Sequence, residues 1–277
     1  MAISSASGRP RALVTGASSG IGTEFAKRLA REGHDLILVA RRRDRLEGLA
    51  EQLRRDSGAQ ADVMCADLTD PEALAKVEAR VTGDDALALL VNNAGFGSYK
   101  PFASIDPSGI DDLIDIHVRA VTRLTRAALP GMIRRGAGGI INISSVYALS
   151  GTLPPNPLPH RATYAGTKAF MLAFTQALAG ELSGTGVKVQ VCLPGRIKTE
   201  FHTSQGIDIT ALPPMMSADD FVTASLAGLM ENELVCVPAL ADAAMFDRVG
   251  EAQVAVLRAT HLQPVLAERY RPPTREG

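Results

Sequence analysis

ALVTGASSGIG, residues 12–22, is the stretch of sequence that indicates the fold. Three apolar residues typical of a strand lead into a turn with three glycines, and a helix follows whose apolar residues recur at helical spacing over residues 20–31. A glycine cluster on its own is often an ordinary loop. Between a strand and a helix, it is typical of a site that binds the pyrophosphate of a dinucleotide.

Each glycine of this turn has an expected role. Gly16 would permit the tight turn, Gly20 would let the backbone approach a pyrophosphate, and Gly22 would allow the helix to pack closely. The N-terminus of the helix would then face the phosphates with its free N–H groups. We therefore expect cofactor contacts along the whole turn, from Gly16, Ser18, Ser19, Gly20, Ile21 and Gly22.

Strand and helix candidates alternate along the chain. The expected strands are short apolar runs at residues 12–14, 36–39, 61–65, 87–91, 140–143, 188–192 and 234–237. The expected helices lie between them at residues 20–31, 43–54, 71–81, 110–133, 163–182 and 218–230. Continuous apolar strands indicate burial on both faces, and a helix between successive strands requires a parallel sheet. We expect a single-domain α/β fold with a doubly wound, seven-stranded parallel sheet of the Rossmann type.

The domain organisation follows from this pattern. We expect a flexible N-terminal tail at residues 1–10 and a catalytic domain at residues 11–240, which includes a substrate loop at about 196–218. Residues 241–277 are expected to form a helical extension and tail, with a helical pattern at 242–259.

The charge and cysteine content exclude several classes of function. Lys and Arg number 29 against 30 Asp and Glu, so no global positive field would attract nucleic acid or an anionic membrane. Cys65, Cys192 and Cys236 are far apart and lack CxxC spacing, which favours neither a disulfide framework nor a metal site. No apolar run is long enough to span a bilayer. We expect a soluble, cytoplasmic protein with no metal.

The second strand ends without an acidic residue. An NAD site would normally place a carboxylate there for the ribose 2′-hydroxyl, but this chain has Arg41, Arg42 and Arg43. Arg41, helped by Arg42, would pair with a 2′-phosphate, so NADP(H) is expected as the cofactor rather than NAD(H). The alternative is a solvated basic face on the helix that begins near Arg43.

Two side chains could carry out proton chemistry, and a serine could hold a substrate oxygen beside them. Tyr164 and Lys168 are four residues apart and share one helix face, and an ammonium group close to a phenol favours the phenolate. Tyr164 is therefore a plausible acid or base. Ser145 follows the fifth strand at the sheet edge where doubly wound proteins bind ligands. Alternatively, Ser144 and Ser145 satisfy backbone groups as the strand ends.

Several motifs together resemble the short-chain dehydrogenase/reductase family. They are residues 15–22, Asn92-Asn93-Ala94-Gly95, Ser145, residues 164–168 and Pro194-Gly195, and the resemblance spans roughly residues 11–200. It implies that Tyr164 donates a proton to a carbonyl oxygen, that Lys168 binds the nicotinamide ribose and lowers the Tyr164 pKa, and that Ser145 orients the substrate. It also implies cofactor contacts at Asp67, Leu68, Asn93, Ala94, Gly95, Tyr164, Lys168, Pro194, Gly195 and Thr199.

The chain departs from this family in two places. Where the family usually has a helical Asn that completes a proton relay, the aligned segment offers His117, which would either serve the relay or pack within the helix. The second departure is a Pro-rich insert at residues 152–157 between Ser145 and Tyr164. Its prolines would make it a stiff wall beside the substrate.

The substrate loop is apolar, and this suggests an apolar substrate. Met215 and Met216 in it would either line an adaptable lid or simply fill the core. We expect an NADPH-dependent oxidoreductase of the carbonyl reductase or alcohol dehydrogenase type that acts on an apolar ketone, aldehyde or oxoacyl compound.

Two other functions are weighed against this one. A catalytically silent NADP(H)-binding regulator would predict damage to the Tyr, Lys and Ser set, which is complete here. An epimerase on the same scaffold usually has a large C-terminal domain, but only about 80 residues follow Pro194. The expected partners are a small-molecule substrate and a second copy of the chain, in a homodimer or homotetramer built through the helices at 110–133 and 163–182.

Overall fold

A computed structural model describes most of the chain in two compact units, Met1–Ala239 and Leu240–Gly277. The described residues are 8–156, 158–203, 213–261 and 265–271. The rest of the chain lies outside them: residues 1–7 of the expected N-terminal tail, residue 157 of the insert, residues 204–212 of the expected substrate loop, and residues 262–264 and 272–277 of the expected extension.

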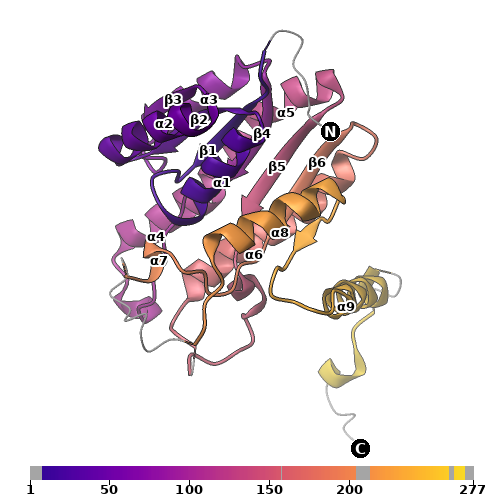
Figure 1. The fold of residues 1–277 in the computed structure, drawn as a ribbon. Coiled ribbons are helices and arrows are strands. Elements are labelled where there is room, and N and C mark those ends of the chain that lie inside the picture. The colour runs from indigo at the N-terminus through magenta and orange to yellow at the C-terminus, as the bar shows by residue number, and fades with distance from the viewer. Residues whose placement is uncertain (1–7, 157, 204–212, 262–264, 272–277) are drawn as a thin grey trace, which may run out of the picture. The chain divides into compact units, whose positions relative to one another are not determined.

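A seven-stranded sheet forms the centre of the larger unit, with the strand order β3-β2-β1-β4-β5-β6-β7 (Figure 1). Every pairing between these strands is parallel. The strands are β1 (Arg11–Thr15), β2 (Asp35–Ala40), β3 (Ala61–Cys65), β4 (Leu87–Asn92), β5 (Gly138–Ile143), β6 (Val187–Cys192) and β7 (Val235–Cys236). The strand order reverses between β1 and β4, which is the point where doubly wound sheets bind ligands. The expected Rossmann-type fold is confirmed.

Helices cover both faces of this sheet. One core layer packs α1 (Gly20–Arg31), α2 (Arg43–Ser57) and α8 (Ala218–Met230) against one face, with side chains such as Phe25 and Phe221 fully buried. The other packs α3 (Pro71–Thr82), α5 (Ala120–Arg135) and α6 (Ala162–Glu181) against the opposite face. Alternate residues of each strand enter the two layers, as the pleat of a strand requires: Leu13 enters one layer and Val14 the other. Both faces are therefore buried.

Polar caps begin two of these helices where the sequence provides them. The Asp70 carboxylate accepts a hydrogen bond from the Glu72 N–H at the start of α3, and Pro71 occupies the first helical position. The Ser217 hydroxyl accepts one from the Asp220 N–H at the start of α8. Local chemistry therefore explains where these two helices begin.

The helix expected at residues 110–133 is not continuous. It consists of α4 (Pro107–Ile114), a single π-helical turn η2 (Asp115–Arg119) and α5. A π turn is rare and is found most often at functional sites. Here it carries His117, which it turns into the interior. Three short helical turns, η1 (Phe102–Ser104), η3 (Val146–Leu149) and α7 (Glu200–Thr203), follow the carboxyl ends of β4, β5 and β6.

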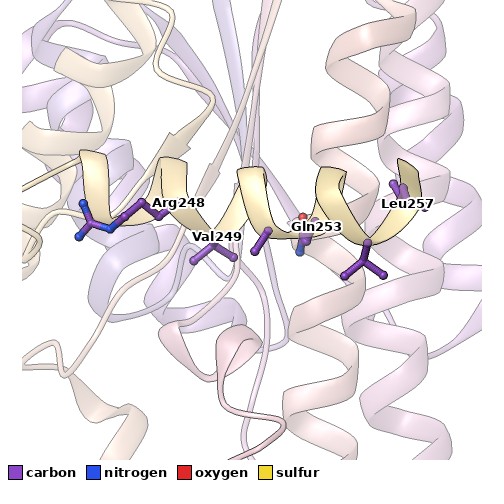
Figure 2. A pocket seen from close by; sticks show the side chains of 6 residues that line it. Arg248, Val249, Gln253 and Leu257 are labelled. Carbon is purple, nitrogen blue, oxygen red and sulfur yellow. The ribbon is translucent and has the colours of Figure 1, made fainter. Parts of the chain in front are cut away.

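The smaller unit contains α9 (Ala244–His261) and the short turn η5 (Glu268–Tyr270). The helical pattern expected at residues 242–259 thus appears as α9. Figure 2 shows the side chains along one side of this helix, where Val249, Ala252, Val256 and Leu257 line an open hollow together with Arg248 and Gln253. Among the helices within the described residues, none is both long and apolar enough to cross a membrane.

Candidate active site

The glycine turn between β1 and α1 is held by the end of β4. Asn93 Nδ2 donates a hydrogen bond to the Thr15 carbonyl oxygen at 2.9 Å. Gly16 has a φ of 67°, and a Cβ atom added to it would lie 2.8 Å from Asn93 Nδ2. A Cβ added to Gly22 would lie 2.6 Å from the same nitrogen. Only glycine fits at both positions, so the turn can pack closely against the end of β4.

The expected site residues gather at one edge of the sheet. Each of these segments directly follows the carboxyl end of a strand: the glycine turn after β1, Arg41 and Arg42 after β2, Asp67 and Leu68 after β3, Asn93, Ala94 and Gly95 after β4, Ser145 after β5, and Pro194, Gly195 and Thr199 after β6. The structure also places Tyr164, Lys168 and His117 beside this edge, through contacts described below. This is the edge at which ligands bind in folds of this type.

Arg42 is the arginine that reaches the glycine turn. Its guanidinium donates to Ser18 Oγ at 3.1 Å, to Ser19 Oγ at 2.7 Å and to the Ser18 carbonyl oxygen at 3.3 Å. Arg41 instead lies 3.6 Å from the Asp67 carboxylate. Burial raises the pKa of Asp67, but hydrogen bonds from Thr69 and the Arg41 charge outweigh it and hold that pKa below its usual value. Both arginines border the place expected for the adenosine end of a dinucleotide.

A carboxylate that the sequence analysis missed lies beside Arg42. Both carboxylate oxygens of Glu200 are contacted by Arg45 Nη1, at 2.7 and 2.8 Å, and one is contacted by Arg42 at 3.0 Å. Hydrogen bonds from Arg45 and then from Arg42 lower the pKa of Glu200. The spacing of Arg42 and Arg45, which puts them on one side of the α2 start, was a signal for the pair. No signal in the sequence indicated that these arginines contact Glu200.

Tyr164, Ser145 and Lys168 form a buried group. Tyr164 is 5% exposed, and the Ser145 side chain acts on its phenol by lowering the pKa of that group. Lys168 is 4% exposed, and its Nζ lies 5.7 Å from the centroid of the Tyr164 ring. The same Nζ donates to the Ile143 carbonyl oxygen at 2.9 Å. The neighbouring Ser144 donates its hydroxyl proton to the Lys168 carbonyl, so of the two serines Ser145 is the one at the phenol.

Burial dominates the acid–base behaviour of this group. The lowering of the Tyr164 pKa that was expected from Lys168 is not found. Burial raises this pKa above its usual value, the Ser145 side chain acts in the opposite direction, and the nearby Tyr147 raises the pKa further. Burial also lowers the pKa of Lys168 to about 7. A protonated phenol therefore sits beside an amine that titrates near neutral pH. Such a pair is suited to donating a proton and to replacing it.

His117 also packs beside Tyr164, with their ring centroids 5.6 Å apart. Thr167 Oγ1 donates to the Tyr164 carbonyl oxygen at 2.9 Å, so it must accept the hydrogen bond from His117 Nδ1 at 3.0 Å. This leaves His117 Nε2 unprotonated, and it is buried without a hydrogen-bond partner. Burial, and secondarily the charge of Lys168, lower the pKa of His117 well below its usual value. The imidazole is therefore neutral at pH 7.

Aromatic rings surround the remaining side of Tyr164. The ring centroids of Tyr99, Tyr147 and Phe201 lie 5.8, 6.3 and 6.4 Å from that of Tyr164. Three of the four tyrosines in the chain thus meet at one point. The wall that they form is apolar with polar edges, and it suits a ligand with large apolar groups.

A buried arginine holds the Pro-rich insert beside this wall. Arg161 is 7% exposed and donates to Ser150 Oγ at 2.7 Å and to the carbonyl oxygens of Ser150, Leu153 and Pro159 at 2.8 to 2.9 Å. Its guanidinium also lies 5.6 Å from the Tyr147 ring centroid. Hydrogen bonds from one arginine, in addition to the prolines, therefore fix the described part of the insert.

The comparison with known sequences agrees with this site. A family model described as short chain dehydrogenase matches residues 10–209, which is more than half of the chain. The chain belongs to the short-chain dehydrogenase/reductase family. The family expected from the motifs is thereby confirmed.

Solved structures of this family are similar along nearly the whole chain. A short-chain dehydrogenase from Sphingobium yanoikuyae in complex with NADPH has 41% sequence identity and a TM-score of 0.88, and the match covers 94% of this chain and 100% of that one. The bulky-bulky ketone specific alcohol dehydrogenase from Comamonas testosteroni has 36% identity and a TM-score of 0.85, with 95% and 99% covered.

Curated relatives are matched over part of their length. A short chain dehydrogenase of Pseudocercospora fijiensis is 34% identical over 210 residues, or 74% of this chain and 65% of that protein. The very-long-chain 3-oxoacyl-CoA reductase of Bos taurus is 32% identical over 193 residues, or 68% of this chain and 60% of that protein. This short-chain dehydrogenase/reductase thus spans less than two thirds of the length of either relative. The family and these names support a dehydrogenase or reductase acting on a CH–OH or C=O group.

The structure bears on one of the two methionines of this short-chain dehydrogenase/reductase for which both a lid and a core role were open. Met216 forms a β-bridge with Ile197 and packs against the core layer of α1 and α8, which favours the core-filling interpretation for this residue.

Tyr99, Tyr147, Arg161 and Arg45 were not anticipated from the sequence as parts of the site. Tyr147 stands two residues after Ser145, which was the one available signal among the aromatic residues.

Proposed function

We propose that this protein is an NADPH-dependent oxidoreductase that interconverts an apolar ketone and its secondary alcohol. The observation that carries this proposal is the buried Tyr164 phenol, flanked by Ser145 and Lys168, at the edge of the sheet that bears the glycine turn. A silent nucleotide-binding protein has no need to bury a lysine whose pKa is lowered to about 7 beside a protonated tyrosine.

The residues at this edge fit a nicotinamide dinucleotide phosphate. Gly16 and Gly22 let the turn pack closely against Asn93, and the N-terminus of α1 would supply N–H donors to a pyrophosphate. Arg42 would hold a 2′-phosphate together with Arg45, which takes the place of the expected Arg41 because Arg41 pairs with Asp67. Residues 41–43 provide no carboxylate for a ribose 2′-hydroxyl. The similar Sphingobium protein was solved in complex with NADPH. When bound, the nicotinamide supplies or takes up the hydride at the carbonyl carbon.

The chain's own residues handle the proton and the orientation. Ser145 and Tyr164 would both hydrogen-bond the substrate carbonyl oxygen, which places the carbonyl carbon for reaction. In the reductive direction, the Tyr164 hydroxyl gives its proton to that oxygen as the C=O bond becomes a C–O–H group. Lys168, whose amine is near its pKa at neutral pH, then stabilises the phenolate and helps to return the proton. In the oxidative direction, the same groups act in reverse.

The aromatic wall supports a bulky, apolar substrate. Tyr99, Tyr147 and Phe201 pack around the Tyr164 ring, and they would contact the groups on either side of a carbonyl. The names of two similar proteins, a bulky-bulky ketone specific alcohol dehydrogenase and a 3-oxoacyl-CoA reductase, agree with such a substrate. We further propose that the protein forms a homodimer or homotetramer. We also propose a reducing, cytoplasmic compartment, which agrees with the three free cysteines.

A direct experiment tests the proposed activity. The purified chain is titrated with NADPH and NADH by cofactor fluorescence, and NADPH oxidation is then followed with aryl alkyl ketones of increasing size and with 3-oxoacyl thioesters. We expect tighter binding of NADPH than of NADH and turnover of the larger ketones. Tyr164→Phe should bind NADPH with unchanged affinity and lose turnover by at least about a hundredfold. Binding without Tyr164-dependent turnover would support a silent regulator instead.

A further inference from the structure

Glu200 lies between the two parts of the site. Its carboxylate is bound by Arg42 and Arg45 at the end of β2 and the start of α2, more than 150 positions away in sequence. Arg42 at the same time holds Ser18 and Ser19 of the glycine turn. The carboxylate thus occupies the two arginines that the proposed function assigns to the 2′-phosphate of the cofactor.

The neighbours of Glu200 contact the rest of the site. Thr199 packs on the glycine turn so closely that a Cβ added to Gly20 would lie 2.9 Å from it. On the other side, Phe201 is 6.4 Å from Tyr164 between ring centroids. Three consecutive residues therefore contact the arginine pair, the glycine turn and the catalytic tyrosine. Glu200 is thus directly bonded in the chain to a residue whose ring belongs to the substrate wall.

An exposed ion pair contributes little to the free energy of unfolding. Stability alone therefore does not explain the contacts of Glu200 with two arginines. Two neighbouring guanidinium groups also bind a phosphate well, so Arg42 and Arg45 can bind a phosphate in place of the Glu200 carboxylate. Two arginines carry two positive charges, Glu200 carries one negative charge, and a 2′-phosphate would bring roughly two more. Both anions cannot be neutralised by this pair, so they compete.

We propose that Glu200 is a selectivity residue that occupies Arg42 and Arg45 until the 2′-phosphate of the cofactor displaces it, and that this displacement shifts Phe201 at the substrate pocket. The inference rests on the proposed NADPH-dependent function. A cofactor without the phosphate leaves Glu200 on the arginines and Phe201 where it lies. The substrate wall therefore takes a different arrangement with NADPH from that with NADH.

Binding of nucleotide fragments tests the competition without catalysis. The full chain is titrated by calorimetry with adenosine 2′,5′-bisphosphate, which carries the 2′-phosphate, and with 5′-ADP, which does not. Glu200→Gln removes the competing charge from an exposed side chain, so we expect adenosine 2′,5′-bisphosphate to bind about fivefold more tightly and 5′-ADP to change less than twofold. The matched control is Glu47→Gln, which removes an exposed carboxylate that pairs with Arg43 on the same helix.

A fluorescence measurement tests the shift of Phe201. The chain has no tryptophan, so Phe201→Trp introduces a single reporter. Adenosine 2′,5′-bisphosphate should change its emission maximum, whereas saturating 5′-ADP should not. In the double variant Phe201→Trp with Glu200→Gln, the changed emission should already be present without nucleotide.

The outcomes separate this inference from the proposed function. If wild type binds adenosine 2′,5′-bisphosphate tightly but Glu200→Gln matches Glu47→Gln, or binds it more weakly, the competition is wrong and the proposed function stands. Equal reporter emission with both nucleotides would overturn the coupling to Phe201. If wild type binds neither adenosine 2′,5′-bisphosphate nor NADPH, both proposals fail.

Discussion

His117 Nε2 lies directly against Gly95, and a Cβ atom added to that glycine would be 2.5 Å from it. The contact joins the loop after β4 to the π turn in front of α5. Because Thr167 fixes the other ring nitrogen, the imidazole cannot turn away without losing its hydrogen bond. Gly95 and His117 therefore fit as a pair, and the ring is held beside Tyr164.

Gly95→Ala should destabilise the protein because the added methyl group meets the ring of His117. Overpacking of this kind costs about 1 to 3 kcal/mol of unfolding free energy. The cost should fall when His117→Ala removes the ring, and urea unfolding of the single and double variants measures this coupling. The control is Gly48→Ala on α2, where an added Cβ meets nothing within 4 Å. Equal costs of Gly95→Ala with and without His117 would refute the pairing.

The neutral state of His117 predicts a pH-dependent stability. Because burial lowers its folded pKa well below 6.5, only the unfolded chain binds this proton as the pH falls through 6.5. Stability from this residue is therefore present above pH 6.5 and is lost below it, by about 1.4 kcal/mol at pH 5.5. His117→Asn should lose that much less than wild type between pH 7.5 and pH 5.5 in urea unfolding. The exposed His160 supplies the control variant His160→Asn, which should follow wild type.

The pH dependence of turnover bears on the proton relay. A histidine that stays neutral throughout the working range carries no proton of its own, so we expect His117→Asn to leave the shape of the kcat profile between pH 6 and 9 unchanged. The measurement is kcat for NADPH oxidation by this variant and by wild type at each pH. An inflection that is present in wild type and absent from the variant would instead assign His117 to the relay.

Much of the fold follows from local sequence signals. The glycine turn, the seven apolar strands and helices such as that at residues 20–31 depend on residues that are neighbours along the chain, and periodicity is enough to detect them. Tyr164 and Lys168 were found for the same reason, since one turn of helix brings them together. In these cases, spacing along the chain already determines spacing in the structure.

The rest of the site depends on long-range packing that no local pattern records. Glu200 meets Arg45 across 155 positions, and Tyr99 meets Tyr164 only because β4 and β5 are adjacent in the sheet. The π turn at His117 was missed because its residues have the same periodicity as the ordinary helices on either side. The structural role of Arg161 was missed because its partners are backbone oxygens, which every residue has.

Arg161 should be required for the shape of the substrate wall. Arg161→Lys keeps the charge but cannot reproduce donation to Ser150, Leu153 and Pro159 together, so we expect a loss of about 2 kcal/mol in unfolding free energy. The insert would loosen beside Tyr147, and KM for bulky ketones should rise several-fold while the dissociation constant of NADPH stays within twofold. Steady-state kinetics with a small and a bulky ketone measure the difference. An equal change in KM for both ketones would show that the insert does not contact the larger substrate.

The burial of the Lys168 amine should lower the stability of the fold, although this amine supports turnover. Burial lowers its folded pKa from 10.5 to about 7, so between these values the unfolded chain binds the proton and the folded chain does not. Stability is therefore highest at alkaline pH and falls as the pH drops from about 10.5 to 7. Lys168→Met removes this dependence, and it should lose less stability than wild type between pH 9.5 and pH 7 in urea unfolding. The exposed Lys198 provides the control Lys198→Met.

The same substitution should abolish most of the activity, because the Tyr164 phenolate would lose its stabilising amine. We expect kcat to fall by about 10² to 10⁴ with the fold intact, since a proton-transfer group contributes about that much. A variant with this loss of kcat and a flatter stability profile would show that the buried amine is retained for chemistry at the expense of stability. If Lys168→Met is instead less stable than wild type at pH 7 and retains its turnover, Lys168 is a structural residue whose hydrogen bond to Ile143 holds the end of β5.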